Sequence, residues 1–98
     1  MVKVFIKRRI IPGNYHRLLK LMLELRIMAT RQQGYVTGET LVRGKDSIEV
    51  LAIGTWISEE HWKAWSTAQQ RIEITNMIIP LLEGGVETTV YSIPYEET

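Results

Sequence analysis

Arg8 is the residue whose position most clearly suggests chemistry. Residues 2–11 alternate between apolar and mostly charged side chains, and Arg8 interrupts the apolar face of this segment. The other members of that face are Val2, Val4, Ile6 and Ile10. A guanidinium on a core-facing position must be paired or reach water, because an isolated buried charge is costly. Arg8 could therefore hold a phenolate, enolate or carboxylate group of a ligand and favour its deprotonated form.

A structural role for Arg8 is the favoured alternative. Its guanidinium could pair with an acid of the same chain, and the candidates are Glu24, Glu73 and Glu83. It could also reach solvent from the end of the strand while its methylene groups stay buried. The two roles differ in a testable way. A ligand-binding Arg8 points into an open apolar pocket, whereas a structural Arg8 meets an acid in a closed core.

Tryptophan is the second residue type with functional potential. Trp56, Trp62 and Trp65 follow one another within a short stretch of the chain. An indole supplies a flat apolar wall and one N–H donor, which suits a pocket for an aromatic ligand. The alternative is that the tryptophans are simply large core residues. The two interpretations weigh about evenly, and the core is favoured for Trp56.

The remaining candidate residues give weaker signals. Arg71 follows Trp65 on a predicted helical segment and allows the same two interpretations as Arg8, with a solvated position favoured. His16 and His61 are isolated histidines, which are more often surface or capping residues than metal ligands. The chain has no cysteine, which excludes disulfides, thiolate metal sites and cysteine nucleophiles. We therefore predict no metal site.

Length and composition indicate one ordinary globular domain spanning residues 1–98. The chain is 45% hydrophobic and 23% charged, as is typical of a folded domain. Its net charge of +1 is too small for the basic surface that nucleic-acid binding requires. The first eleven residues are too charged for a signal peptide, and no later segment could span a bilayer. We expect a cytoplasmic protein without a nucleic-acid or membrane partner.

The strands that must position these residues can be predicted from alternation and from β-branched and aromatic composition. They are expected at residues 2–11, 35–43, 48–56 and 86–93. The second and third predicted strands are separated by a turn at residues 44–47, Gly-Lys-Asp-Ser, and should form a hairpin.

Two helical regions are predicted between the strands. Apolar residues that repeat at three and four predict a helix from the capping residue Asn14 to about Thr30. A second helix begins at the capping residue Ser58 and continues, either whole or broken, towards Leu81, where Pro80 favours a separate last turn. The resulting order predicts a ferredoxin-like α+β fold, βαββαβ, with an antiparallel sheet and the helices on one face.

The predicted sheet has apolar residues on both faces. Two helices can cover only one face, and the other would expose a contiguous set of apolar residues. This set comprises Phe5, Leu41, Leu51, Ile53, Tyr91 and Ile93. A second copy of the sheet is the simplest cover, which predicts a homodimer. The alternative is that this face stays hydrated.

A set of short motifs is distributed over nearly the whole chain. They are Pro12-Gly13, Gln33-Gly34-Tyr35, Gly38-Glu39-Thr40, the pair Trp56 and Trp65 nine residues apart, and Ile78, Pro80, Leu81 and Leu82. Together they resemble the antibiotic biosynthesis monooxygenase (ABM) family of the dimeric α+β barrel superfamily. The resemblance implies a dimeric α+β barrel in which the counterpart of Trp65 borders a pocket between helices and sheet. The family includes cofactor-independent monooxygenases of phenolic or quinol-like polycyclic substrates, and haem-degrading oxygenases.

The haem-degrading branch of that family has further residues that this chain lacks. Besides the two tryptophans, it carries a helical histidine ten residues after the second tryptophan and an asparagine on the first strand. The corresponding positions here are Thr75 and Ile6. A threonine cannot replace imidazole as a usual haem-iron ligand. Haem degradation by that arrangement is therefore disfavoured, and we predict no cofactor.

The resemblance and the residues together predict a cofactor-independent monooxygenase that oxidises a small, flat aromatic substrate with molecular oxygen. The catalytic candidates are Trp65 and Arg8, and the expected substrate contacts are Ile6, Met22, His61, Trp62, Arg71 and Thr75. The alternative function is a non-catalytic homodimer that binds a small hydrophobic ligand, or whose pocket its own side chains fill. Both alternatives stay open at this point because a fold does not fix a function.

Overall fold

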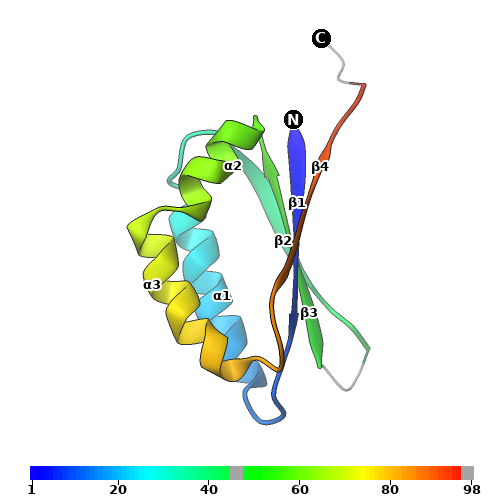
Figure 1. Cartoon of the computed structure of the whole chain (residues 1–98), viewed down its shortest axis with the longest axis vertical. Helices are drawn as coiled ribbons and strands as arrows, with labels where there is room; N and C mark the ends of the chain where they lie inside the picture. Colours follow the sequence, from blue (N-terminus) through cyan, green and yellow to red (C-terminus); the bar gives the residue numbers. More distant parts are fainter. Residues whose placement is uncertain (45–47, 96–98) are drawn as a thin grey trace.

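The computed structural model describes residues 1–44 and 48–95, which form a four-stranded antiparallel sheet with helices on one face (Figure 1). The strands are β1 (Val2–Arg9), β2 (Tyr35–Val42), β3 (Glu49–Trp56) and β4 (Glu87–Ser92). The helical elements are α1 (Tyr15–Ala29), α2 (Glu59–Ser66), α3 (Gln69–Ile78) and a 3-10 turn, Ile79–Leu81. This order confirms the predicted ferredoxin-like α+β fold. Residues 45–47 of the predicted turn lie outside the described residues.

The strands are arranged in the order β2-β3-β1-β4, so β1 and β3 are the central strands. In their register, Ile6 lies opposite Ala52, and Arg8 lies opposite Val50. Arg8 therefore projects from the middle of the sheet and not from an edge. The first strand is shorter than the predicted 2–11 and ends at Arg9; Ile10 forms an isolated bridge with Leu82 and donates its backbone N–H to the carbonyl of Ile48 at 2.7 Å.

Helix α1 has the predicted amphipathic pattern. Its buried residues are Leu18, Leu21, Met22, Leu25 and Ala29, which recur at three- and four-residue spacing. Asn14 occupies the predicted cap position and its carbonyl accepts the first helical hydrogen bond, from Leu18 N at 2.9 Å, but its side chain makes no capping bond. The stripe buries the helix against the sheet.

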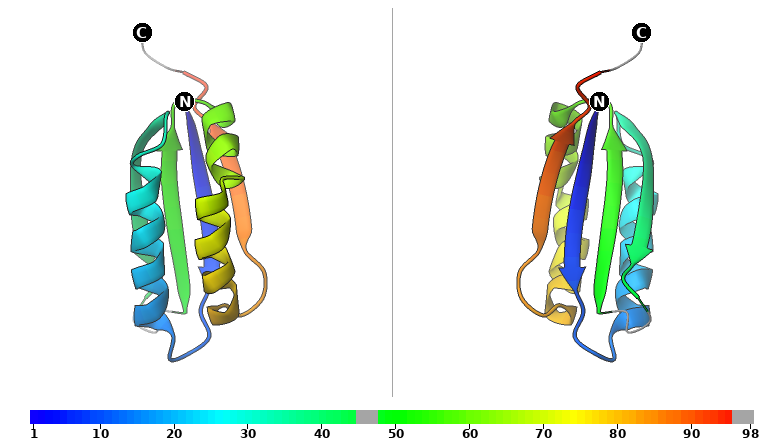
Figure 2. Two further views of the ribbon diagram at one scale, coloured as in Figure 1. Left: turned by 90° about the vertical axis from the view of Figure 1, so that its left-hand side faces the viewer. Right: turned by 90° about the vertical axis from the view of Figure 1, so that its right-hand side faces the viewer.

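The second helical region is divided, as predicted, into separate pieces. Helix α2 ends at Ser66 and α3 begins at Gln69, while Pro80 lies in the 3-10 turn. Figures 1 and 2 show that α3 runs beside α1 on the same side of the sheet. The break lets α2 and α3 take different directions, so residues from both can point to one place above the sheet. None of the helices in the described residues is long and apolar enough to cross a membrane.

The two faces of the sheet are covered differently. Alternate residues of β1, namely Val2, Val4, Ile6 and Arg8, are buried under the helices. The right-hand view of Figure 2 shows the opposite face, over which no described element packs. On that face Tyr91 is exposed and meets the ring of Phe5 edge to face, with centroids 5.3 Å apart. The apolar residues predicted to need a cover therefore lie on an open surface.

Candidate functional site

A cavity of about 90 Å³ lies between the helices and the middle of the sheet. Its wall contains six of the eight residues predicted from the sequence to form the site: Ile6, Arg8, Met22, Trp62, Trp65 and Arg71. They come from β1, α1, α2 and α3. The fold thus gathers residues that are far apart in the sequence, while their roles remain predictions.

The floor of the cavity is built from the smallest residues of β2 and β3. Gly38 lies directly opposite Gly54 in the register of these strands, and Ala52, two residues before Gly54, faces the same side. A Cβ atom on Gly38 would lie 2.6 Å from the Tyr35 hydroxyl, and one on Gly54 would lie 3.2 Å from Trp56 Nε1. Glycine at these two positions therefore leaves room for the cavity and for two aromatic rings at its edge.

Aromatic rings form much of the cavity wall. Trp62 and Trp65 are both buried on α2, and Trp56 and Tyr35 complete the wall at the sheet. Tyr35 and Trp56 meet edge to face, with centroids 5.3 Å apart, and Trp56 lies 6.0 Å from Trp62. Trp56 is only 2% exposed, as expected of a core residue. Such a wall suits a flat apolar ligand.

Arg8 differs from the structural role that the sequence favoured. Only 2% of the residue is exposed, so its guanidinium does not reach bulk solvent from the strand end. Among the described residues it forms no ion pair, and its Nε atom is buried without a hydrogen-bond partner. Burial, together with the neighbouring charge of Arg71, lowers the pKa of Arg8 from its ordinary value to about 10. Arg8 is therefore a buried cation at neutral pH.

Arg71 is also closer to the site than the sequence favoured. The prediction of a solvated position was wrong, because the residue is half-buried and contributes to the cavity wall. Its guanidinium carbon lies 5.1 Å from the ring centroid of Trp62, which is cation–π geometry. Burial lowers the pKa of Arg71 as well.

A third guanidinium lies at the edge of the cavity. Arg26 is exposed on α1, and its Nη2 donates a hydrogen bond to the carbonyl oxygen of Gly38 on β2. Glu39 is the one acid in the described wall, but it is exposed and lies between two residues that face the cavity, so its side chain points to the opposite face. The wall is therefore positively charged and lacks a facing carboxylate among the described residues.

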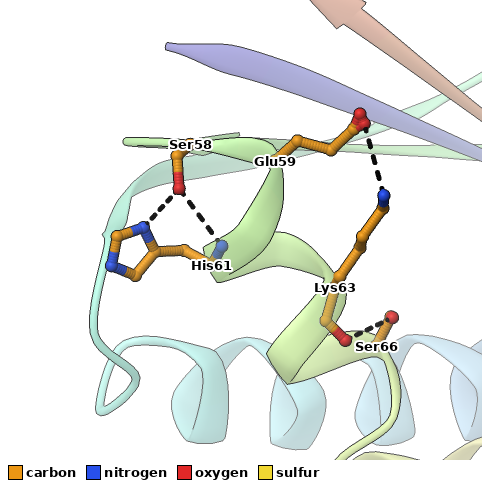
Figure 3. Close-up of polar contacts among 5 residues, drawn as sticks. All are labelled: Ser58, Glu59, His61, Lys63 and Ser66. Carbon is orange, nitrogen blue, oxygen red and sulfur yellow. Dashed lines mark hydrogen bonds and ion pairs between the residues drawn. The ribbon is translucent and has the colours of Figure 1, made fainter.

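Two predicted site residues lie outside the described cavity wall. His61 Nδ1 lies 2.6 Å from Ser58 Oγ at the start of α2, and the same oxygen accepts a hydrogen bond from His61 N at 3.3 Å (Figure 3). The histidine ring also packs against Gly34, where φ is +84°. Thr75 donates its hydroxyl hydrogen to the carbonyls of Arg71 and Ile72 in its own helix. Both side chains are thus engaged in local helix contacts.

Several wall residues escaped the sequence analysis as site residues. Gly38 and Gly54 are glycines inside strands, which is a known sign of a close approach to a backbone, but their pairing depends on the register of β2 and β3. Tyr35 was identified only as part of a motif. Arg26 breaks the apolar stripe of α1, and this break is the signal that could have identified it.

The size of the cavity limits what it can accept without movement. About 90 Å³ corresponds to roughly three water molecules, and an engineered cavity that binds benzene measures about 150 Å³. A monocyclic ring therefore requires some side chains to move. Arg26 is exposed and lies at the edge, so its movement would widen the cavity at low cost. No group of three or more potential metal-ligating side chains occurs within residues 1–44 and 48–95.

The elements and the cavity together define a class of protein, the ferredoxin-like α+β domains with a ligand-sized space between helices and sheet. Solved structures place the fold more narrowly. A protein from Nitrosomonas europaea assigned to the antibiotic biosynthesis monooxygenases has a TM-score of 0.88 at 8% identity, over 97% of this chain and 100% of that one. One from Deinococcus radiodurans with the same assignment has a TM-score of 0.88 at 10% identity, over 100% and 97%.

A third solved structure has a stated activity. SnoaB from Streptomyces nogalater, a cofactor-independent oxygenase, has a TM-score of 0.83 at 13% identity, and the match covers 97% of this chain and 95% of SnoaB. No protein-family model and no curated protein matches the sequence. The chain therefore has the fold of the antibiotic biosynthesis monooxygenases, as the sequence motifs implied.

Proposed function

We propose that this protein is a cofactor-independent monooxygenase that oxidises a small phenol- or quinol-like aromatic compound with molecular oxygen. The observation that carries the proposal is the buried guanidinium of Arg8, which forms no ion pair with any described residue and lies in a cavity walled by Trp62 and Trp65. The fold shared with SnoaB supports the same class of reaction. Arg8 would hold an anionic oxygen of the substrate, and Trp65 would position its ring.

In this proposal the substrate itself supplies the electrons that reduce oxygen. In its keto tautomer the phenol-like substrate carries a ring CH2 group, which reacts with O2 to give C=O and water, so one oxygen atom enters the product and both hydrogens leave with the other. The cation Arg8 favours the anionic form of the substrate because it lies in a water-poor site where electrostatic stabilisation is strong. Arg8 cannot serve as the base because it is itself protonated at neutral pH. The proton lost from the substrate therefore goes to water.

The test is absorbance-monitored oxidation of a panel of quinols and anthrones, with and without oxygen. The expected result is oxygen-dependent product formation that Trp65→Phe and Arg8→Met both reduce by at least about tenfold, in line with loss of one electrostatic or positioning contact. Arg17→Gln serves as the matched control, since Arg17 is an exposed residue of α1 outside the described cavity wall. If no member of the panel is oxidised, the oxygenase proposal fails.

We also propose that two copies pair through the open face of the sheet. A shallow hollow on this face is lined by Phe5, Leu51, Tyr91 and Ile93, with Lys3, Lys7 and Thr89 around them. Burial of such a contiguous apolar surface against the same surface of a second copy is favourable. The assembly expected is a homodimer with its sheets face to face.

Light scattering after size exclusion tests the dimer. Leu51→Lys should shift the wild-type dimer towards a monomer, because it places a charge in the middle of the hollow. Leu23→Lys is the control, since Leu23 is 56% exposed on α1, on the helix side of the sheet. A wild-type monomer, or equal behaviour of the two variants, would refute pairing by this face.

The size of the cavity favours a second candidate function. A space of about 90 Å³ is too small for a polycyclic ring in the observed arrangement, so the protein could bind a small ligand without turnover. Ligand binding that is unaffected by oxygen, with no product from any panel member, would support this function. Oxygen-dependent product would exclude it.

A further inference from the structure

The cavity contains a positive charge that the described residues do not neutralise. Arg8 projects from the central strand β1 into the wall, is 2% exposed, and keeps its Nε atom without a hydrogen-bond partner. The acids that could have paired with it, Glu24, Glu73 and Glu83, form no ion pair with it. A buried guanidinium without a partner is costly and needs an explanation.

A second guanidinium contributes to the same wall from another element. Arg71 reaches it from α3, where Trp62 supports one face of the side chain at 5.1 Å. The two charges are close enough that Arg71 contributes to the lowered pKa of Arg8. They repel each other in the ligand-free protein, and an anion between them would remove both the repulsion and the unpaired charge.

We propose that the cavity binds its ligand through a carboxylate group that lies between the guanidinium groups of Arg8 and Arg71. The inference rests on the proposed function in that it names the class of that substrate, an aromatic carboxylate. The ring of the ligand would lie against the indoles of Trp62 and Trp65. Arg71 thereby becomes a second anion-binding residue of the site.

A carboxylate fits these observations better than the other anions that Arg8 could hold. A guanidinium presents a planar fork of donors that matches the two oxygens of a carboxylate, whereas a phenolate or enolate offers one oxygen. The remaining wall is mostly apolar, including Ile6, Met22 and Leu25. Phosphate or sulfate would need donors around all its oxygens, which this wall does not supply. The carboxylate is also small enough for the limited space.

Titration of the purified protein with benzoate and benzamide tests the proposal without any turnover. The two probes have nearly the same shape and differ in charge, and binding can be followed by calorimetry or by the fluorescence of Trp62 and Trp65. Benzoate should bind at least about tenfold more tightly than benzamide, as expected for charge-assisted hydrogen bonds in a buried site. Arg71→Gln should remove about tenfold of the benzoate affinity, and Arg8→Met should remove the preference for benzoate. Arg17→Gln should leave both affinities unchanged.

Three results would overturn the proposal. The first is that benzoate binds no more tightly than benzamide. The other two are that inorganic phosphate binds as tightly as benzoate, or that 4-nitrophenolate binds more tightly than benzoate. Arg71 is half-buried, so its variant keeps the test valid if Arg8→Met does not fold. Benzoate preference without any oxidation would refute the monooxygenase and keep the carboxylate site. Oxidation of neutral substrates, together with equal binding of benzoate and benzamide, would keep the monooxygenase and refute the carboxylate site.

Discussion

Replacing Arg8 by methionine should stabilise the ligand-free protein, although loss of a buried residue normally destabilises. The reason is that the folded state buries a charge that forms no ion pair within residues 1–44 and 48–95. Burial, and to a lesser degree the charge of Arg71, lowers the pKa of Arg8 well below its ordinary value, to about 10, so the group remains charged at neutral pH. Each tenfold change in the acid constant is worth about 1.4 kcal/mol, which gives about 3 kcal/mol against folding.

The gain expected from the variant is smaller than this figure. Methionine retains an unbranched apolar stem, but it loses the packing of the guanidinium group against its neighbours. We expect the free energy of unfolding to rise by about 1 to 2 kcal/mol at pH 7, measured by urea unfolding at one fixed protein concentration. Arg17→Met, at an exposed position of α1, should change it by less than about 0.5 kcal/mol.

The pH dependence of this difference has a definite sign. The pKa of Arg8 is lower in the folded than in the unfolded protein, so the unfolded state binds more protons once the pH rises above about 10. The free-energy cost of burying the Arg8 charge is therefore fully present at neutral pH and decreases as the pH rises through about 10. The stability difference between the variant and the wild type should be constant below that pH and shrink above it.

One result would refute the reasoning about Arg8. If Arg8→Met destabilises the ligand-free protein by more than about 1 kcal/mol, the guanidinium is compensated in the free protein. The carboxylate site would then lose its main support, because no unpaired charge would remain for a ligand to neutralise. A stability difference between Arg8→Met and the wild type that stays constant above about pH 10 would point to the same conclusion.

Two further predictions concern the floor of the cavity and the start of α2. Gly38→Ala should push the Tyr35 hydroxyl aside and lower the free energy of unfolding by about 1 kcal/mol, whereas Gly85→Ala, which meets open space, should be nearly neutral; thermal unfolding of the two variants measures the contrast. Ser58→Ala should cost about 1 kcal/mol in urea unfolding because it removes the cap of α2. Ser66→Ala, which loses only a bond to its own helix, should cost less, and equal losses would argue against the capping role.

Most of the fold could be predicted from the sequence because its signals are local. Alternation along residues 2–9 identifies the central strand and its buried face, and the three- and four-residue spacing of apolar residues identifies α1. Ser58 and Pro80 mark the start and the last turn of the second helical region. These signals act within one turn or one strand, so they do not depend on distant residues.

The candidate site could be predicted only in part. The sequence placed Arg8 on the buried face and Trp62 and Trp65 together on one helix, because both facts follow from periodicity. It also suggested His61 and Thr75, which the structure places outside the described wall, in contacts with their own helices. Local hydrogen bonding can engage such short polar side chains, and periodicity alone cannot reveal it.

The sequence by itself determined that a cation, Arg8, interrupts the otherwise apolar face of the first strand. It also determined that the sheet has apolar residues on both faces. The tertiary structure alone decided what surrounds that cation. Whether an acid reaches Arg8 depends on how α1 and α3 pack over β1, and the same packing places Arg71 of α3 in the cavity wall. The space beneath them exists because the register sets Gly38 opposite Gly54. Packing and register join residues far apart in the chain, so no local pattern specifies them.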